Sequence, residues 1–430
     1  MKLRIAYTAL AVCAAALPAI PEAALAASPA ARADASEQTL HDKAVGIQKQ
    51  IVTFDNHLDL PFDYAGAGTD GPAQFDLPKA ERGLLKGASF AIFVPQGPRT
   101  SEDTANAREQ AQKKYEIIAG IAKDNPGRAA VAYSPDDVKR IEASGKFAVV
   151  FSILNGNAIG EGLSQFDEWY KKGVRIVGFN HAGNNDLSDS SRPNLLRGDK
   201  LDEHGGLSDL GKQAVTRLND LGVVIDVSQL SGKALIQVLS LTRAPVVASH
   251  SNARAIVDHP RNLSDEQLLA IKKNGGVVAV NAFSSWISPL PADIQQKANQ
   301  IRSEYQVPTE QNIAALQPLT EKGLTVLPSD KYEEYNTKFH ALIMDPANRA
   351  TLSEYVDQID YVVKKIGIDH VGISSDFNHG GGVVGWSDES EATNVTAELL
   401  KRGYKEKDIA KLWGGNFLRI WDQVRHLAKK

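Results

Sequence analysis

Two residues that could bind a metal ion, His57 and Asp59, end the apolar segment IVTFDNHLD. Alternate side chains of a strand point to the same face, so this imidazole and this carboxylate would lie side by side at the strand's carboxyl end. Zn²⁺ accepts both types of ligand. Because an H-x-D pair also arises by chance in loops, the interpretation depends on whether other strands end in polar side chains directed at the same place.

The elements that must position these residues alternate regularly along the chain. Near-continuous Val- and Ile-rich segments indicate strands buried on both faces, as in a parallel sheet, and most are followed by amphipathic helical segments. We expect eight strands, at 51–59, 88–95, 147–154, 174–181, 223–229, 244–250, 277–281 and 369–376. Eight such units favour an α/β fold of the (β/α)8 TIM-barrel type, with an open α/β sheet as the alternative. No glycine-rich nucleotide-binding motif follows a strand.

The carboxyl ends of the strands converge on one site in a barrel of this type. Polar residues with metal-binding or acid–base chemistry stand at four of these ends: His57, Asp59, His181, His250 and Asp376. Together they indicate a common metal-dependent site more strongly than any one of them does. The other histidines, including His379, lie in helices, loops or strand starts and are interpreted as structural.

The organisation of the chain follows from its composition. Residues 1–26 are typical of a secretory signal peptide and predict a secreted protein, in the bacterial periplasm. We expect a disordered leader at 27–38 and a single barrel domain at 39–430, with a polar insertion at 282–350. The only cysteine, Cys13, falls in the signal, so the mature protein would have no disulfide; lipid attachment at Cys13 is the alternative.

Charge and hydropathy exclude two classes of partner. The net charge is −4 and no basic stripe is present, which argues against nucleic acid binding. No segment is apolar over the length needed to span a membrane. A small molecule is therefore the expected partner, and the insertion is expected either to help close its pocket or to form a contact in a homodimer.

Seven segments between residues 51 and 425 form a more specific pattern: DNHLDLP (55–61), FDLPKAERGLLKGASFAIFVP (75–95), NHAGNNDLSDSS (180–191), HGGLSDLGKQAVTRLNDLGVVIDVS (204–228), APVVASHSNARAIVDHPRNLSDEQL (244–268), VGISSDF (371–377) and GGNFLRI (414–420). This pattern resembles the membrane (renal) dipeptidase family of metallopeptidases, peptidase family M19, within the amidohydrolase-like barrels. The resemblance implies hydrolysis of dipeptides, often with tolerance of a C-terminal D-residue, at a two-zinc centre.

The resemblance also implies roles for individual residues. His57 and Asp59 correspond to ligands of the first zinc ion, and His250 corresponds to a ligand of the second. Among residues that act on the substrate, His181 corresponds to the histidine that contacts the carbonyl oxygen. Further substrate roles are implied for Arg261, which would bind the substrate carboxylate, and for Asp376, which would handle the proton. A guanidinium fork suits a carboxylate, and a carboxylate beside a metal can transfer a proton to the leaving amine.

Two ligands of the family pattern are absent. Leu154 stands in the sequence ILNG where the family has a bridging Glu, and Gln229 stands in DVSQ where the family has a His. Leucine cannot bind a metal, and a glutamine offers only a neutral carbonyl oxygen, a poor ligand for zinc. The sequence therefore does not support a complete two-zinc centre.

A single zinc or other divalent ion per chain is the expectation that remains. His57 and Asp59 would hold it with help from Asp376 or His250, which gives the three protein ligands usual for a catalytic site. A second ion would require a further ligand such as Asp226. The functional prediction is a metal-dependent dipeptidase acting on small peptides. A weakened or inactive family member that binds peptides or cell-wall fragments is the alternative, followed by an amidohydrolase with a non-peptide substrate.

Overall fold

The computed structural model describes residues 29–159, 162–307 and 327–429. The chain divides into two compact units, Met1–Thr39 and Leu40–Lys430. The expected signal peptide and Cys13 lie outside the described residues. Helix α1 (Pro29–Gln50) begins near the start of the expected disordered leader, so residues 29–38 are helical instead. Their high alanine content explains the difference, since alanine has the strongest helix propensity.

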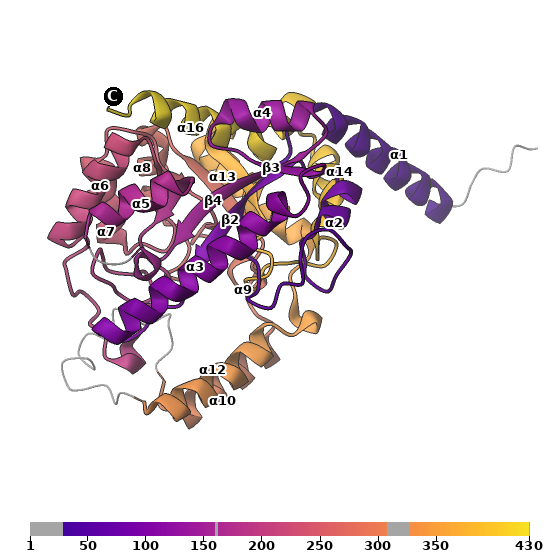
Figure 1. The fold of residues 1–430 in the computed structure, drawn as a ribbon. Coiled ribbons are helices and arrows are strands. Elements are labelled where there is room, and N and C mark those ends of the chain that lie inside the picture. Colours follow the sequence, from indigo (N-terminus) through magenta and orange to yellow (C-terminus); the bar gives the residue numbers. More distant parts are fainter. Residues whose placement is uncertain (1–28, 160–161, 308–326, 430) are drawn as a thin grey trace, which may run out of the picture. The chain divides into compact units, whose positions relative to one another are not determined.

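The second unit contains a parallel barrel whose strands follow the chain in order (Figure 1). Its strands are β1 (Phe54–Leu58), β2 (Gly87–Phe93), β4 (Phe147–Leu154), β5 (Val174–Gly178), β6 (Val224–Asp226), β7 (Val247–Ala248), β8 (Val277–Asn281) and β9 (Val371–Ser374). The last strand meets the first, because the backbone N–H of Asp376 donates to the His57 carbonyl oxygen and that of Asp59 donates to Phe377, both at 3.0 Å. The predicted (β/α)8 fold is confirmed, and the open sheet is excluded.

A ninth strand, β3 (Ala129–Val131), was not expected. It pairs only with β4 and lies off the circuit of the barrel. Three residues are too few for an apolar pattern, and two of these three are only partly buried. The sequence therefore carries little signal for this strand.

Helices follow most of the strands and surround the barrel in Figure 1. They are α2 (Leu77–Arg82), α3 (Ser101–Lys123), α4 (Pro135–Ala143), α5 (Ser164–Lys171), α6 (Asp209–Leu221), α7 (Gly232–Leu241), α8 (Asp265–Asn274), α13 (Leu352–Ile366), α14 (Ala392–Lys401), α15 (Glu406–Ala410) and α16 (Asn416–His426). Capping boxes fix the starts of α8 and α13, where Ser264 and Thr351 each accept from the backbone three residues on. No helix in the described part of the chain is both long and apolar enough to cross a membrane.

The amino-terminal end of the barrel is closed by α16. Phe417 and Trp421 pack in one buried cluster with Phe54, Val224 and Val277, the first residues of three strands. The rings of Phe54 and Phe417 stack at a centroid distance of 5.2 Å. With this end filled by apolar side chains, only the carboxyl end of the barrel is open to a functional site.

The insertion at 282–350 is largely helical where it is described. It contains α9 (Ser284–Ile287), α10 (Ala292–Glu304) and α12 (Ser329–Ile343). Helices α10 and α12 pack against each other (Figure 1), and the rings of Tyr305 and Tyr335 meet at 5.7 Å. Residues 308–326 of the insertion lie outside the described residues. Its role in closing a pocket or forming a homodimer remains a prediction.

Candidate active site

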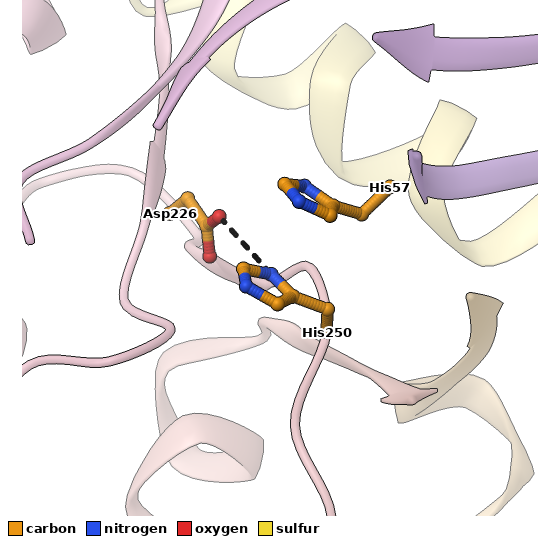
Figure 2. Close-up of side chains that lie close together, drawn as sticks. All are labelled: His57, Asp226 and His250. Carbon is orange, nitrogen blue, oxygen red and sulfur yellow. Dashed lines mark ion pairs between the residues drawn. The ribbon is translucent and has the colours of Figure 1, made fainter. Parts of the chain in front are cut away.

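Two histidine rings lie against each other at the carboxyl end of the barrel. His57 from β1 and His250, two residues past β7, stack with centroids 3.8 Å apart and planes within 9° (Figure 2). The pairing of β1 with β2 changes register between Asp55 and Leu58, an irregularity of the kind that redirects the side chains of a strand. The site thus depends on a local departure from regular strand geometry.

Both stacked imidazoles are held in the neutral form. Burial, with the nearby His379 as a second cause, lowers the pKa of His57 to about 3. Burial also lowers the pKa of His250 well below its usual value, and His57 contributes to that shift. The neutral imidazole is the form that binds a metal ion, so the lowered pKa values keep both rings in the form that a metal ion requires near neutral pH.

A hydrogen-bond network fixes the tautomer of His250. The Gln229 amide nitrogen lies 3.2 Å from Nε2 of His250, while Gln229 Oε1 accepts from Arg192 at 2.7 Å. With its oxygen engaged, Gln229 can only donate to His250, which places the ring proton on Nδ1. That nitrogen lies 2.7 Å from the Ser249 hydroxyl, which in turn donates to Asp226. Both ring nitrogens of His250 are therefore engaged within the protein, and a metal ion on His250 would have to replace one of these contacts.

Three residues at the barrel mouth are close enough to hold a metal ion: His57, Asp226 and His250. Their candidate ligand atoms lie within 4.8 Å of one another, and all three side chains are buried (Figure 2). Next to this group, His57 Nε2 and Asp376 Oδ1 lie 3.9 Å apart, and neither has a hydrogen-bond partner among the described residues. Two buried polar atoms without hydrogen-bond partners can both be satisfied by a cation that lies between them. The donor set therefore fits one divalent ion.

Asp376 is a buried carboxyl group with one oxygen engaged. Its Oδ2 accepts from the Asn281 amide at 3.0 Å. Burial raises the pKa of Asp376 to about 6. A carboxyl group with this pKa can take up and release a proton near neutral pH.

Asp59 lies outside the candidate metal group. Its Oδ1 accepts from the Lys114 ammonium at 3.1 Å, and its Oδ2 lies 3.1 Å from Nδ1 of His379. Lys114 comes from α3 and is buried, and it also donates to the Leu60 carbonyl oxygen. A metal ion on Asp59 would lie beside this ammonium, and the ligand role expected for Asp59 stays a prediction.

His379 belongs to the site, although the sequence suggested only a structural role. Its Nε2 lies 3.1 Å from Nε2 of His181, and the Phe93 ring lies 4.5 Å from both imidazoles. Burial is the largest single effect and opposes the charged form of His379, but the hydrogen bond to Asp59 and the charges of Asp376 and Asp59 together outweigh it and raise the pKa of His379. Burial, then the charge of His379, lowers the pKa of His181. The one signal in the sequence was the position of His379, three residues after Asp376.

Arg261 binds the segment of the chain that carries His250. Its two terminal nitrogens donate to the Ser251 hydroxyl, at 3.0 Å, and to the His250 carbonyl oxygen. The guanidinium also lies 4.9 Å from the ring centre of Trp286. Burial, with the charge of Arg192 as the next cause, lowers the pKa of Arg261 to about 9. The structure thus brings Arg261 to the site, with both terminal nitrogens bound to the protein.

Neither of the two residues that depart from the family pattern has a side chain suited to a zinc ion. Leu154 is the last residue of β4 and is buried. Gln229 is buried and bound to both Arg192 and His250. The number of ions that the site holds stays a prediction.

The fold and the site together define a class of hydrolases, in which a (β/α)8 barrel presents histidines and carboxylates at the carboxyl ends of its strands. The chain belongs to the membrane dipeptidase family, peptidase family M19, whose sequence model matches residues 41–430. This match confirms the resemblance inferred from the motifs.

Relatives and solved structures agree with this assignment. Dipeptidase tcpJ of Claviceps purpurea (strain 20.1) is 28% identical over 362 residues, which cover 82% of this chain and 70% of the relative. The probable dipeptidase PvdM from Pseudomonas aeruginosa is 47% identical, with a TM-score of 0.84 over 91% of this chain and 100% of that one. A metallopeptidase from Rhodobacter sphaeroides, solved with a phosphinate mimic of the dipeptide L-Ala-D-Ala, shares the fold at 22% identity and a TM-score of 0.65, over 87% of this chain and 99% of that one.

Proposed function

We propose that the protein is a dipeptidase that works with a single divalent metal ion, held by His57, Asp226 and His250. The observation that carries this proposal is the buried group of three candidate ligands, in which His57 Nε2 has no hydrogen-bond partner among the described residues and lies near the equally unpaired Asp376 Oδ1. When bound, such an ion supplies polarisation of a carbonyl oxygen and acidification of water. Zinc is the first candidate, because it accepts imidazole and carboxylate ligands in three-residue sites.

The residues around the ligands have complementary tasks in this proposal. The free oxygen of Asp376 faces His57 and is suited to take a proton from water and return it to the leaving amine. Nε2 of His379 lies 3.1 Å from Nε2 of His181. The raised pKa of His379 favours its charged form, in which Nε2 donates to His181 and the proton of the neutral His181 ring lies on Nδ1. We assign that N–H to the carbonyl oxygen of the substrate. Arg261 would contribute positive charge toward the substrate carboxylate.

The finer substrate preference is also a proposal. The family resemblance supports tolerance of a C-terminal D-residue, and the substrate panel should therefore contain L,L- and L,D-dipeptides.

The sequence of residues 1–26 supports export to the bacterial periplasm.

Metal analysis combined with dipeptide hydrolysis tests the proposal. Elemental analysis of the purified protein should find about one divalent ion per chain, and a chelator should abolish hydrolysis. Asp226→Asn should lose both metal and activity. Asp209→Asn, a change of the same type on the exposed start of α6, is the matched control and should retain both.

A peptide-binding protein without catalysis is the second candidate function. Two contacts favour it, since Lys114 neutralises Asp59 and Gln229 binds His250. It would replace the first proposal if the protein contained no metal and hydrolysed no dipeptide, yet bound dipeptides in calorimetry.

A further inference from the structure

A separate cavity of about 230 Å³ lies between the loop after β7 and the helical insertion. Val257 comes from that loop, Trp286 and Leu290 from the start of the insertion, and Arg302 and Phe339 from α10 and α12. None of His57, Asp226 and His250 lines this cavity. It is therefore a site distinct from the candidate metal group.

The cavity has an aromatic and apolar wall. The rings of Phe283 and Trp286 stack at 3.9 Å with an interplanar angle of 18°. Trp286 is buried, whereas Phe283 and Phe339 are partly exposed. Small-molecule sites are usually concave and lined by such side chains, with a few polar groups that set orientation. A flat ring or a branched aliphatic group suits this wall.

The charge of the lining favours an anion. Arg192 and Arg302 supply two positive charges, against the single carboxylate of Asp258. The Asp258 side chain is 84% exposed and lies 3.7 Å from Arg254, so its charge is directed to solvent and partly balanced outside the cavity. The two guanidinium groups are therefore the dominant charges that a ligand in the cavity would meet.

One buried hydrogen-bond donor of Arg302 is not used by the described residues. Its guanidinium lies 4.6 Å from the ring centre of Phe339, and one terminal nitrogen donates to Asn299 at 3.2 Å. Its Nε is buried and has no hydrogen-bond partner among the described residues. Buried donors are normally satisfied, and a carboxylate is the partner that a guanidinium binds best.

We propose that this cavity binds a carboxylate carried on an aromatic or branched apolar body, such as the last residue of a short peptide or an acylated amino acid. The carboxylate is held by Arg302, and the apolar body packs against Trp286 and Phe339. The site shares side chains with the barrel mouth, since Arg192 binds Gln229 and Trp286 stacks on Arg261. Binding in the cavity does not require a metal ion at His57, Asp226 and His250.

Calorimetric titration with 3-phenylpropionate tests the proposal. Chelator-treated protein is used, so that no metal ion can bind the carboxylate. We expect saturable binding of one molecule per chain, and binding of the neutral 3-phenylpropanamide about tenfold weaker, because charge-assisted hydrogen bonds are the stronger ones. Equal affinity for the acid and the amide, or no binding of the acid at millimolar concentration, would overturn the proposal.

Variants locate the site. Arg302→Gln and Phe339→Ala should each weaken binding of the acid by about tenfold. Lys297→Gln removes the same charge from an exposed position of α10 and should bind like the parent protein. Asp376→Asn, at the barrel mouth, should also leave the affinity unchanged. Weaker binding in Asp376→Asn with unchanged binding in Arg302→Gln would place the ligand at the barrel mouth and contradict the proposal, whatever the outcome for hydrolysis.

Discussion

At the scale of single residues, Lys114 is the side chain that most changes the interpretation of the site. It is buried at the barrel mouth with Asp59 and lies 4.3 Å from the ring centre of Phe62. A buried charge pair contributes little net stability, but either partner without the other is costly. Lys114 and Asp59 therefore depend on each other.

Replacing Lys114 by methionine should destabilise the protein strongly. The change keeps the length of the side chain but leaves the buried Asp59 with His379 as its remaining charged partner, which costs about the lower end of 3–5 kcal/mol. Urea unfolding measures the free energy of unfolding. Lys113→Met, at an exposed position beside it, should change that free energy by less than about 0.5 kcal/mol. The double variant Lys114→Met with Asp59→Asn should recover much of the loss, and a double variant no more stable than the single one would contradict the pairing.

Asp376 should give the stability of the metal-free protein a specific pH dependence. Burial raises the pKa of Asp376 from 3.8 to about 6, so between these values the folded state binds a proton that the unfolded state releases. The folded state is therefore destabilised as the pH rises through this window. The loss in the free energy of unfolding is complete above about pH 6 and is on the order of 3 kcal/mol. Asp376→Asn stays neutral and should be more stable than the parent protein by that order at pH 7.5, but nearly equal to it at pH 3.5. Denaturant unfolding of chelator-treated protein at both pH values is the measurement, and a difference that does not depend on pH would refute this account.

The sequence located some of the site residues and not others, for physical reasons. His57, His181, His250 and Asp376 end strands, and strand ends converge in a barrel. Lys114 comes from the buried face of a helix, where a lysine is unexpected and no local pattern marks its partner. Asp226 was recognisable as polar and near a strand end, but only the fold shows that its carboxylate lies beside His57 and His250.

At the scale of elements, helix α16 supports the site from the opposite end of the barrel. Its apolar face packs on the first residues of several strands, so it holds the amino end together. The eight barrel strands were predictable because buried parallel strands leave long apolar runs in the sequence. The start of α1 was not predicted, although its alanine content favours a helix, and the short β3 was not because a three-residue strand is decided by its surroundings.

Truncating Phe417 should test how much α16 contributes. Phe417→Ala removes a ring that stacks on Phe54 and packs against Trp421, and such a cavity costs roughly 3–5 kcal/mol. Chemical unfolding measures this loss. Leu427→Ala, just past the end of the same helix and 41% exposed, should cost no more than about 0.5 kcal/mol. Similar values for the two variants would show that α16 does not close the barrel as described.

At the scale of the whole molecule, a single bound ion should raise stability through linkage. A ligand that binds only the folded state at a hundred times its dissociation constant stabilises by about 2.7 kcal/mol. Adding Zn²⁺ to chelator-treated protein should therefore raise its unfolding temperature. Asp226→Asn should abolish the shift, while Asp209→Asn should retain it. An equal shift in both variants would place the ion elsewhere.

The family pattern can also be restored. Leu154→Glu together with Gln229→His supplies the two missing ligands and should raise the metal content from about one ion per chain toward two. Elemental analysis of the double variant and the parent protein gives the comparison. Two ions in the parent protein would show that the described ligand set is incomplete.

The closure of the barrel also has a consequence for synthesis. The site joins Asp59 to His379 across 320 positions of the chain, and the backbone of His57 pairs with that of Asp376. A growing chain therefore cannot assemble the site until almost the whole chain has left the ribosome, even if its earlier strands have already paired. Newly made protein should remain inactive until β9 and the residues after it have been added, and any fragment that stops before β9 should lack Asp376, His379 and the closed barrel that positions the other site residues.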